Sequence, residues 1–120
     1  MKTHQKIAKL ISEVWENKDF DLLEANLSDN VQWYEGSYSD PLHTHRAVIG
    51  QWKKDLSTQK DINSPVEVIM ANGQEGFYHC RASWIEDAQG QRELDGIFHI
   101  RLDSDGKIEY FNSWWTEKSE

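Results

Sequence analysis

Residues 94–115, LDGIFHIRLDSDGKIEYFNSWW, decide how this chain folds. Apolar and polar side chains alternate through the first half of this segment, which is typical of a strand with one buried face. Asp105-Gly106 is a common hairpin turn, and the residues after it again suit a strand that closes on Trp114 and Trp115. The segment therefore predicts an antiparallel hairpin.

Together with Asp105-Gly106, two earlier turn signals, Asn72-Gly73 and residues 87–90 (DAQG), divide the chain after residue 65 into four strands of an antiparallel meander. The second of these strands has an apolar face made of Tyr78, Cys80, Ala82 and Trp84. Its opposite face carries both apolar and charged side chains. The next strand has the same mixture on this face of the sheet, where it carries His99 and Arg101. The mixed face is interpreted either as a solvated surface or as a dimer surface.

The N-terminal half of the chain predicts helices that cover the apolar face of the sheet. The first is an amphipathic helix with Thr3 as its N-cap and a stripe made of Ile7, Leu10, Ile11, Val14 and Trp15. A short second helix is expected around Phe20, Leu23 and Leu27, ended by Ser28, Asp29 and Asn30. Thr44 is expected to cap a third helix with Val48, Trp52 and Leu56 inward and Lys53, Lys54 and Asp55 outward. The fold class is therefore α+β, with a curved antiparallel sheet that wraps the helices.

Composition limits the classes of function. The chain has 120 residues and a formal net charge of -8, which suits one domain over residues 1–120. Its single cysteine, Cys80, cannot form an intrachain disulfide, so we expect a reducing, cytoplasmic setting. Lys and Arg are scattered and no apolar run reaches about 20 residues, so neither nucleic acid nor a membrane is expected as a partner. Without a GxGxxG, Walker, GxSxG or HExxH motif, no cofactor or resident metal is expected.

The order helix, helix, strand, helix and four-strand meander resembles the nuclear transport factor 2-like superfamily. Residues 94–115 and residues 18–36, KDFDLLEANLSDNVQWYEG, resemble its SnoaL-like branch in particular, which includes ketosteroid isomerases and polyketide cyclases. The resemblance implies a cone-shaped half barrel with a pocket under the helices. It also implies a homodimer through the outer face of the sheet.

The resemblance also suggests residue roles. Glu35 falls where ketosteroid isomerases keep their general-base aspartate, and Trp115 falls where an aromatic residue lines their pocket. The two oxyanion donors of those enzymes correspond here to Ile11 and Phe98, which cannot donate a hydrogen bond. Many relatives carry an acid where this chain has Ser113. Steroid isomerisation is therefore not expected.

Glu35 alternates with Trp33 along an expected short strand, so the two side chains share a face. If this face is inward, burial would raise the pKa of the carboxyl and suit it to acid/base work; otherwise it is a rim or ion-paired carboxylate. Side chains expected to line the pocket are Trp33, Trp52, Phe98, Phe111, Ser113 and Trp115, whereas Trp114 is expected on the outer face.

His43 and His45 lie in the irregular segment 36–45, GSYSDPLHTH, and an HxH spacing in an extended segment directs both imidazoles to one side. Two histidines fall short of the three protein ligands of a catalytic zinc site. They are interpreted as weaker candidates for proton relay or substrate hydrogen bonding at the pocket rim, or as exposed loop residues.

Two functional hypotheses follow. In the first, the domain binds a small apolar molecule and Glu35 catalyses a metal-independent proton transfer of the isomerase, cyclase or dehydratase type. In the second, it is a non-catalytic homodimeric binding or interaction domain. The residues alone do not name the ligand.

Overall fold

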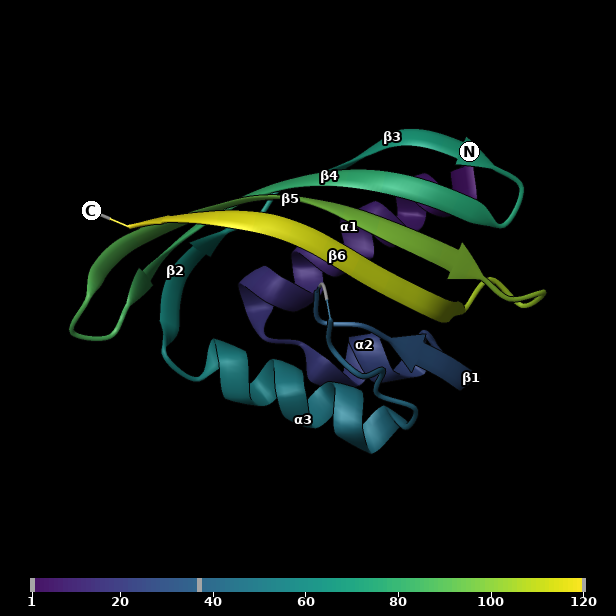
Figure 1. Cartoon of the computed structure of the whole chain (residues 1–120), viewed down its shortest axis with the longest axis horizontal. Helices are drawn as coiled ribbons and strands as arrows, with labels where there is room; N and C mark the ends of the chain where they lie inside the picture. Colours follow the sequence, from purple (N-terminus) through teal and green to yellow (C-terminus); the bar gives the residue numbers. More distant parts are fainter. Residues whose placement is uncertain (1, 37, 120) are drawn as a thin grey trace.

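The computed structural model describes residues 2–36 and 38–119 and has the expected α+β architecture (Figure 1). Its elements in chain order are α1 (Lys2–Asn17), α2 (Phe20–Ala25), β1 (Leu27–Trp33), α3 (His45–Leu56), β2 (Gln59–Asn63), β3 (Val66–Asn72), β4 (Glu75–Glu86), β5 (Gly90–Leu102) and β6 (Ile108–Ser119).

Six strands of the described residues form one curled sheet, in the order β1-β6-β5-β4-β2, with β3 also paired to β4. The meander from β3 to β6 is antiparallel and confirms the strands predicted from the three turns. The sheet is mixed, however, because β1 runs parallel to β6 and pairs Trp33 with Phe111. The short strand β2, which pairs with the C-terminal half of β4, was not predicted.

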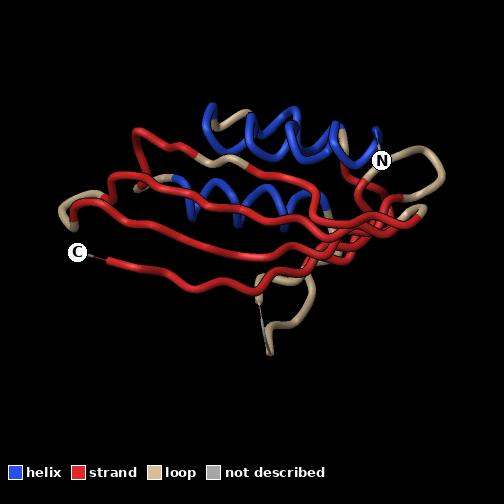
Figure 2. Tube along the Cα trace, turned by 90° about the horizontal axis from the view of Figure 1, so that it is seen from above, coloured by secondary structure: helices blue, strands red, loops and turns tan. Residues whose placement is uncertain are grey.

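All three helices lie on the concave side of the curled sheet (Figures 1 and 2). The stripe predicted for α1 is buried, with Ile11 and Val14 fully inaccessible to solvent. Burial of this stripe against the sheet stabilises the layer, since each fully buried aliphatic side chain contributes about 1.5–3 kcal/mol. The result is the half barrel that the resemblance implied.

Several predicted helix boundaries were wrong. Helix α1 begins at Lys2, so Thr3 lies within it rather than capping it. Leu27 belongs to β1 and not to the second helix, which instead begins after Asp19, whose side chain accepts a hydrogen bond from the Leu22 N–H. The N-cap role of Thr44 in α3 is confirmed by its bond from the Ala47 N–H.

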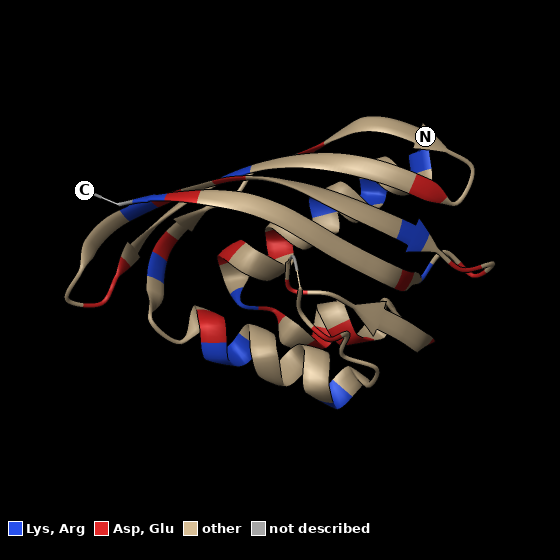
Figure 3. Cartoon of the chain, viewed as in Figure 1, with Lys and Arg blue, Asp and Glu red and all other residues tan. Residues whose placement is uncertain are grey.

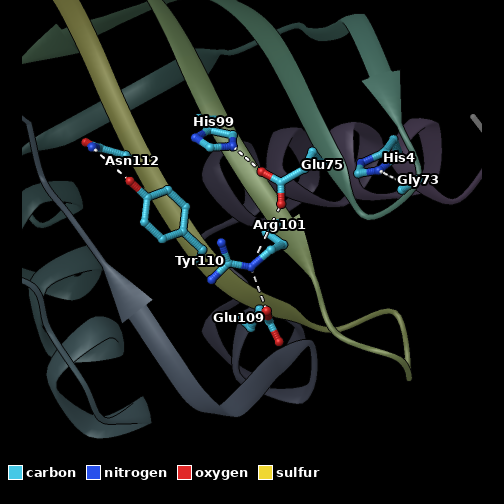
Figure 4. A network of polar contacts seen from close by, with 8 residues as sticks. All are labelled: His4, Gly73, Glu75, His99, Arg101, Glu109, Tyr110 and Asn112. Carbon is cyan, nitrogen blue, oxygen red and sulfur yellow. Dashed lines mark hydrogen bonds and ion pairs between the residues drawn. The ribbon is translucent and has the colours of Figure 1, made fainter.

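The two faces of β4 differ as predicted: Tyr78 and Cys80 are fully buried, whereas Phe77 on the outer face is 40% exposed. Ion pairs cross the outer face, where His99 lies 2.6 Å from Glu75 (Figure 4). A short pair between Arg101 and Glu109 continues this network along β5 and β6.

His4 was given no role from the sequence, yet it is one of the few buried polar residues. One ring nitrogen bonds to the Tyr78 hydroxyl, and the other lies 2.9 Å from the Gly73 carbonyl oxygen, the contact drawn in Figure 4. His4 therefore ties the start of α1 to the β3–β4 turn, which is a structural role.

Lys and Arg residues are distributed over helices and strands rather than gathered on one element (Figure 3). None of the described helices is long and apolar enough to cross a membrane.

Candidate functional site

A cavity of about 340 Å³ is lined by residues of the sheet and of helices α1 and α3. This volume falls at the lower end of the roughly 300–1,000 Å³ of small-molecule sites. The wall is mostly aromatic, with a set of polar side chains; its lining residues are Trp15, Trp33, Glu35, Trp52, Asp55, Leu56, Gln59, Trp84, Glu86, Leu94, Phe98, Phe111, Ser113, Trp115 and Glu117.

The aromatic rings of the wall contact one another in a continuous series. Trp33 stacks on Phe111 with ring centroids 3.9 Å apart, as expected for parallel-paired neighbours on β1 and β6. Trp52, from α3, stands nearly perpendicular to Trp33 at 72° and to Trp15 at 79°. Helix α3 therefore inserts an indole between the end of β1 and helix α1, and the rings hold each other in fixed orientations.

Glu35 is a carboxyl group set in this aromatic wall. The indole N–H of Trp33 donates to its Oε1 at 3.1 Å, and its own backbone N–H donates to the Ser39 hydroxyl. Burial, reinforced by the nearby charge of Asp55, raises the pKa of Glu35 to about 7, against the opposing effect of the Trp33 hydrogen bond. At neutral pH this carboxyl is therefore divided between its protonated and ionised forms, the state that suits a general acid or base.

Asp55 is exposed, as its predicted outward orientation requires, and from the last turn of α3 it also lines the open side of the cavity, which was not predicted. Gln51, one turn earlier, donates to its Oδ1 at 2.9 Å. Burial raises the pKa of Asp55, against the Gln51 hydrogen bond and the charge of Lys54. The site thus contains two carboxyl groups whose negative charges disfavour each other's ionisation.

All six side chains predicted to line the pocket do face this cavity: Trp33, Trp52, Phe98, Phe111, Ser113 and Trp115. Trp115 is still 44% exposed, so it forms part of the mouth, and it packs against Gly36, where a Cβ would lie 3.1 Å from the ring. Trp114 points to the outer face, as predicted from its alternation with Trp115.

The two candidate histidines lie away from the cavity. His43 is exposed, and His45 is the first residue of α3, where its Nε2 donates to the Ser28 carbonyl oxygen at 3.0 Å. His45 also lies 3.8 Å from carboxylate oxygens of Glu24 and Asp29. The pair is therefore split between a solvent position and a contact with β1. Within the part of the chain that the structure describes, no group of three or more His, Cys, Asp or Glu residues is arranged to hold a metal ion.

The cavity contains neutral hydrogen-bonding groups at two buried positions. The Gln59 side chain accepts from the Trp15 indole at 2.9 Å, which leaves its amide N–H groups as donors, and the Ser113 hydroxyl lies on β6. Ile11 is fully buried and Phe98 contributes only its ring, so neither matched position supplies an oxyanion donor.

Sequence reasoning missed Asp55, Gln59, Glu86 and Glu117 as cavity residues. A signal for two of them was present: Glu86 and Glu117 each follow a tryptophan by two residues, the same spacing that placed Glu35 beside Trp33. No sequence pattern indicated Gln59 as a cavity residue, because it lies on strand β2, which was not predicted.

Comparison with known proteins assigns the family. The sequence profile of the SnoaL-like domain matches residues 7–111, and the chain belongs to this family, within the nuclear transport factor 2-like superfamily. No curated protein sequence matches the chain.

Solved structures share the fold at low sequence identity. A Mycobacterium tuberculosis LEH-like epoxide hydrolase superposes with a TM-score of 0.73 at 15% identity, covering 96% of this chain and 84% of that one. SalBIII, described as an epoxide hydrolase/cyclase-like enzyme with a role in pyran ring formation in the polyether salinomycin, gives 0.79 at 13% identity over 100% of both chains. A putative SnoaL-like polyketide cyclase from Shewanella denitrificans gives 0.79 at 9% identity, covering 93% and 89%.

Proposed function

We propose that the cavity binds a small, largely apolar molecule and that Glu35 transfers a proton to or from it, in a reaction of the isomerase, cyclase or dehydratase type. The observation that carries this proposal is the position of Glu35 in an aromatic wall, where its pKa is raised to about 7. A catalytic acid or base works best when its pKa lies near the working pH, and an exposed Glu at about 4.3 does not meet this condition.

The wall also limits the substrate. Because Ile11 and Phe98 offer no donor, a substrate that develops an enolate at those positions would gain no stabilisation. The Gln59 amide and the Ser113 hydroxyl are neutral hydrogen-bond donors on the same wall. They suit a reaction whose transition state develops less negative charge on the substrate than an enolate carries. The structurally similar hydrolase and cyclase-like enzymes favour an enzymatic role over simple binding.

The proposal is tested with 5-nitrobenzisoxazole, a probe in which a base removes the C3 proton while the N–O bond breaks to give a cyanophenolate. We expect the protein to accelerate this elimination, and the rate to rise with pH as Glu35 ionises. Glu35→Gln should remove most of the acceleration. Glu13→Gln, an exposed change of equal charge on α1, should retain it. Full activity in Glu35→Gln would refute the role of Glu35.

We also propose, as the alternative to catalysis, a homodimer formed by the outer face of the sheet. Two large apolar side chains on that face, Phe77 and Trp114, are 40% and 45% exposed. Phe77 also stacks on His99 with ring centroids 4.6 Å apart, which extends the aromatic surface from β4 to β5. Such a surface suits the apolar core of an interface, with the ion pairs of β5 and β6 nearby.

A further inference from the structure

A three-residue pattern, Trp-x-Glu, occurs at three places around the cavity. It is WYE at residues 33–35, WIE at 84–86 and WTE at 115–117. The first segment runs from Trp33, the last residue of β1, into the loop that follows, and the other two lie in β4 and β6. All six Trp and Glu side chains line the cavity. Side chains two residues apart in extended backbone share a face, so each tryptophan brings a carboxylate with it.

In two of these segments the tryptophan and glutamate are bonded to each other. The Trp33 indole N–H donates to Glu35 at 3.1 Å, and the Trp84 indole N–H donates to Glu86 at 2.9 Å. These bonds hold each carboxylate at the edge of an indole ring. Each of these bonded pairs therefore presents an aromatic ring and a carboxylate to the cavity side by side.

The charge of the lining is one-sided. Four carboxyl groups face the cavity, those of Glu35, Asp55, Glu86 and Glu117, and none of the described lining residues is Lys, Arg or His. Two nearby cations offset part of this charge. Arg92 lies 3.2 Å from Glu117, and Lys54 acts on Asp55 from the same helix. The remaining excess is negative, which opposes an anionic ligand and favours a cationic one.

The aromatic rings are arranged to receive a cation. Trp52 stands nearly perpendicular to both Trp15 and Trp33, and Trp84 contacts Trp15 with centroids 6.3 Å apart. These four indoles, from α1, α3, β1 and β4, all line the cavity, and Phe111 covers one face of Trp33. Tryptophan is the side chain whose ring face attracts cations most strongly, and enclosures of aromatic rings are suited to alkylated ammonium groups.

We propose that the ligand of this cavity carries an ammonium group on a largely apolar body, with the charged nitrogen among the tryptophans and carboxylates and the body against Leu94, Phe98 and Phe111. This inference rests on the proposed function, because it names the class of molecule for the same cavity. It adds one requirement, a positive charge, that an apolar pocket alone would not impose.

The test compares two molecules of the same shape that differ by one charge: 3-hydroxyphenyltrimethylammonium and 3-tert-butylphenol. Isothermal titration calorimetry near neutral pH should show that the ammonium compound binds about tenfold more tightly or better. Indole N–H signals in ¹⁵N spectra should locate both compounds, with Trp15, Trp33 and Trp52 shifting. Trp114 serves as an internal control, because it lies on the outer face.

Variants separate charge from shape. At about pH 8.5, where Glu35 is ionised in both proteins, Asp55→Asn should weaken binding of the ammonium compound about threefold or more. It should leave binding of 3-tert-butylphenol unchanged. Glu86→Gln, on another element, provides a second variant with the same expectation. Glu13→Gln removes an exposed charge outside the cavity and should change neither affinity.

Two results would overturn the inference, and they differ in what they say of the cavity. Equal or tighter binding of 3-tert-butylphenol would show that charge is not recognised, while the proposal of an apolar ligand site would stand. Absence of binding and of indole shifts with both compounds at millimolar concentration would overturn the inference and the ligand-binding proposal together.

Discussion

The indole N–H of Trp33 donates a hydrogen bond of 3.1 Å to Oε1 of Glu35, two residues further along the chain. The bond stabilises the ionised carboxylate and so lowers its pKa, whereas burial and the charge of Asp55 act in the opposite direction and prevail. The protonation state of Glu35 is thus set by groups on β1 and α3, and each of these contributions is open to a separate test.

Asp55→Asn should lower the pKa of Glu35 below its value of about 7, because it removes the negative charge that disfavours ionisation. The pKa should remain above about 4.3, since burial acts independently of Asp55. Carbon-detected NMR titration of the Glu35 carboxyl, assigned with Glu35→Gln, measures both values. Glu13→Gln serves as the control. An unchanged pKa in Asp55→Asn would mean that the two carboxyl groups do not interact.

Glu35→Gln should stabilise the protein at alkaline pH and leave it nearly unchanged in mild acid. The pKa of Glu35 rises from 4.5 in the unfolded chain to about 7 in the folded one. The stability of the folded state is therefore fully present below about pH 4.5, where the carboxyl is protonated in both states, and part of it is lost as pH rises through 7. At about pH 8 the ionised carboxylate costs up to roughly 3 kcal/mol, which glutamine avoids. Urea unfolding at about pH 5 and 8 measures the difference. Equal stabilisation at both pH values would contradict this linkage.

Alternation along strands made the sheet predictable, because a period of two fixes which side chains share a face. Tyr78 and Cys80 in β4 were placed correctly on this basis. The pairing of β1 with β6 was not predictable in the same way, since it joins residues more than 70 positions apart and no local pattern records it. The antiparallel turns, by contrast, join neighbours in the chain.

Helical periodicity placed Asp55 correctly among the exposed residues of α3 but did not show that it borders the cavity. Lys53, Lys54 and Asp55 were read as one outward face, and all three are exposed, but the last turn of α3 also borders the cavity. Asp55 is therefore exposed to solvent and lies at the cavity as well. The sequence pattern separates buried from exposed positions and does not distinguish bulk solvent from an internal opening.

Gly96→Ala should destabilise the protein by about 1–3 kcal/mol through steric overlap. A Cβ at this position in β5 would lie 2.9 Å from the Trp114 carbonyl oxygen and 3.0 Å from the Trp115 Cβ, so the backbone of β6 would have to move. Gly50→Ala is a matched control in α3: its Cβ meets nothing within 4 Å, and the helix should gain up to about 1 kcal/mol. Unfolding in urea compares the two, and equal effects would argue against close packing at Gly96.

Cys80 should resist thiol reagents in the folded protein. Burial, with a contribution from the charge of Asp95, raises the pKa of its thiol to about 12, so almost no thiolate forms near neutral pH. Labelling with 5,5′-dithiobis(2-nitrobenzoate) should therefore proceed at the rate of unfolding and become rapid in denaturant. Immediate stoichiometric labelling of the native protein would show that the apolar face of β4 is open to solvent.

Trp114→Arg should convert the proposed homodimer to a monomer, because it places a charge at an exposed apolar position on the outer sheet face. Tyr38→Arg makes the same kind of change at a fully exposed position in the segment between β1 and α3, and it should leave the assembly intact. Sedimentation equilibrium over a range of micromolar concentrations measures the mass of all three proteins. A wild-type protein that is monomeric throughout this range would exclude the dimer. Dissociation by both variants would indicate that net charge, rather than the sheet face, controls association.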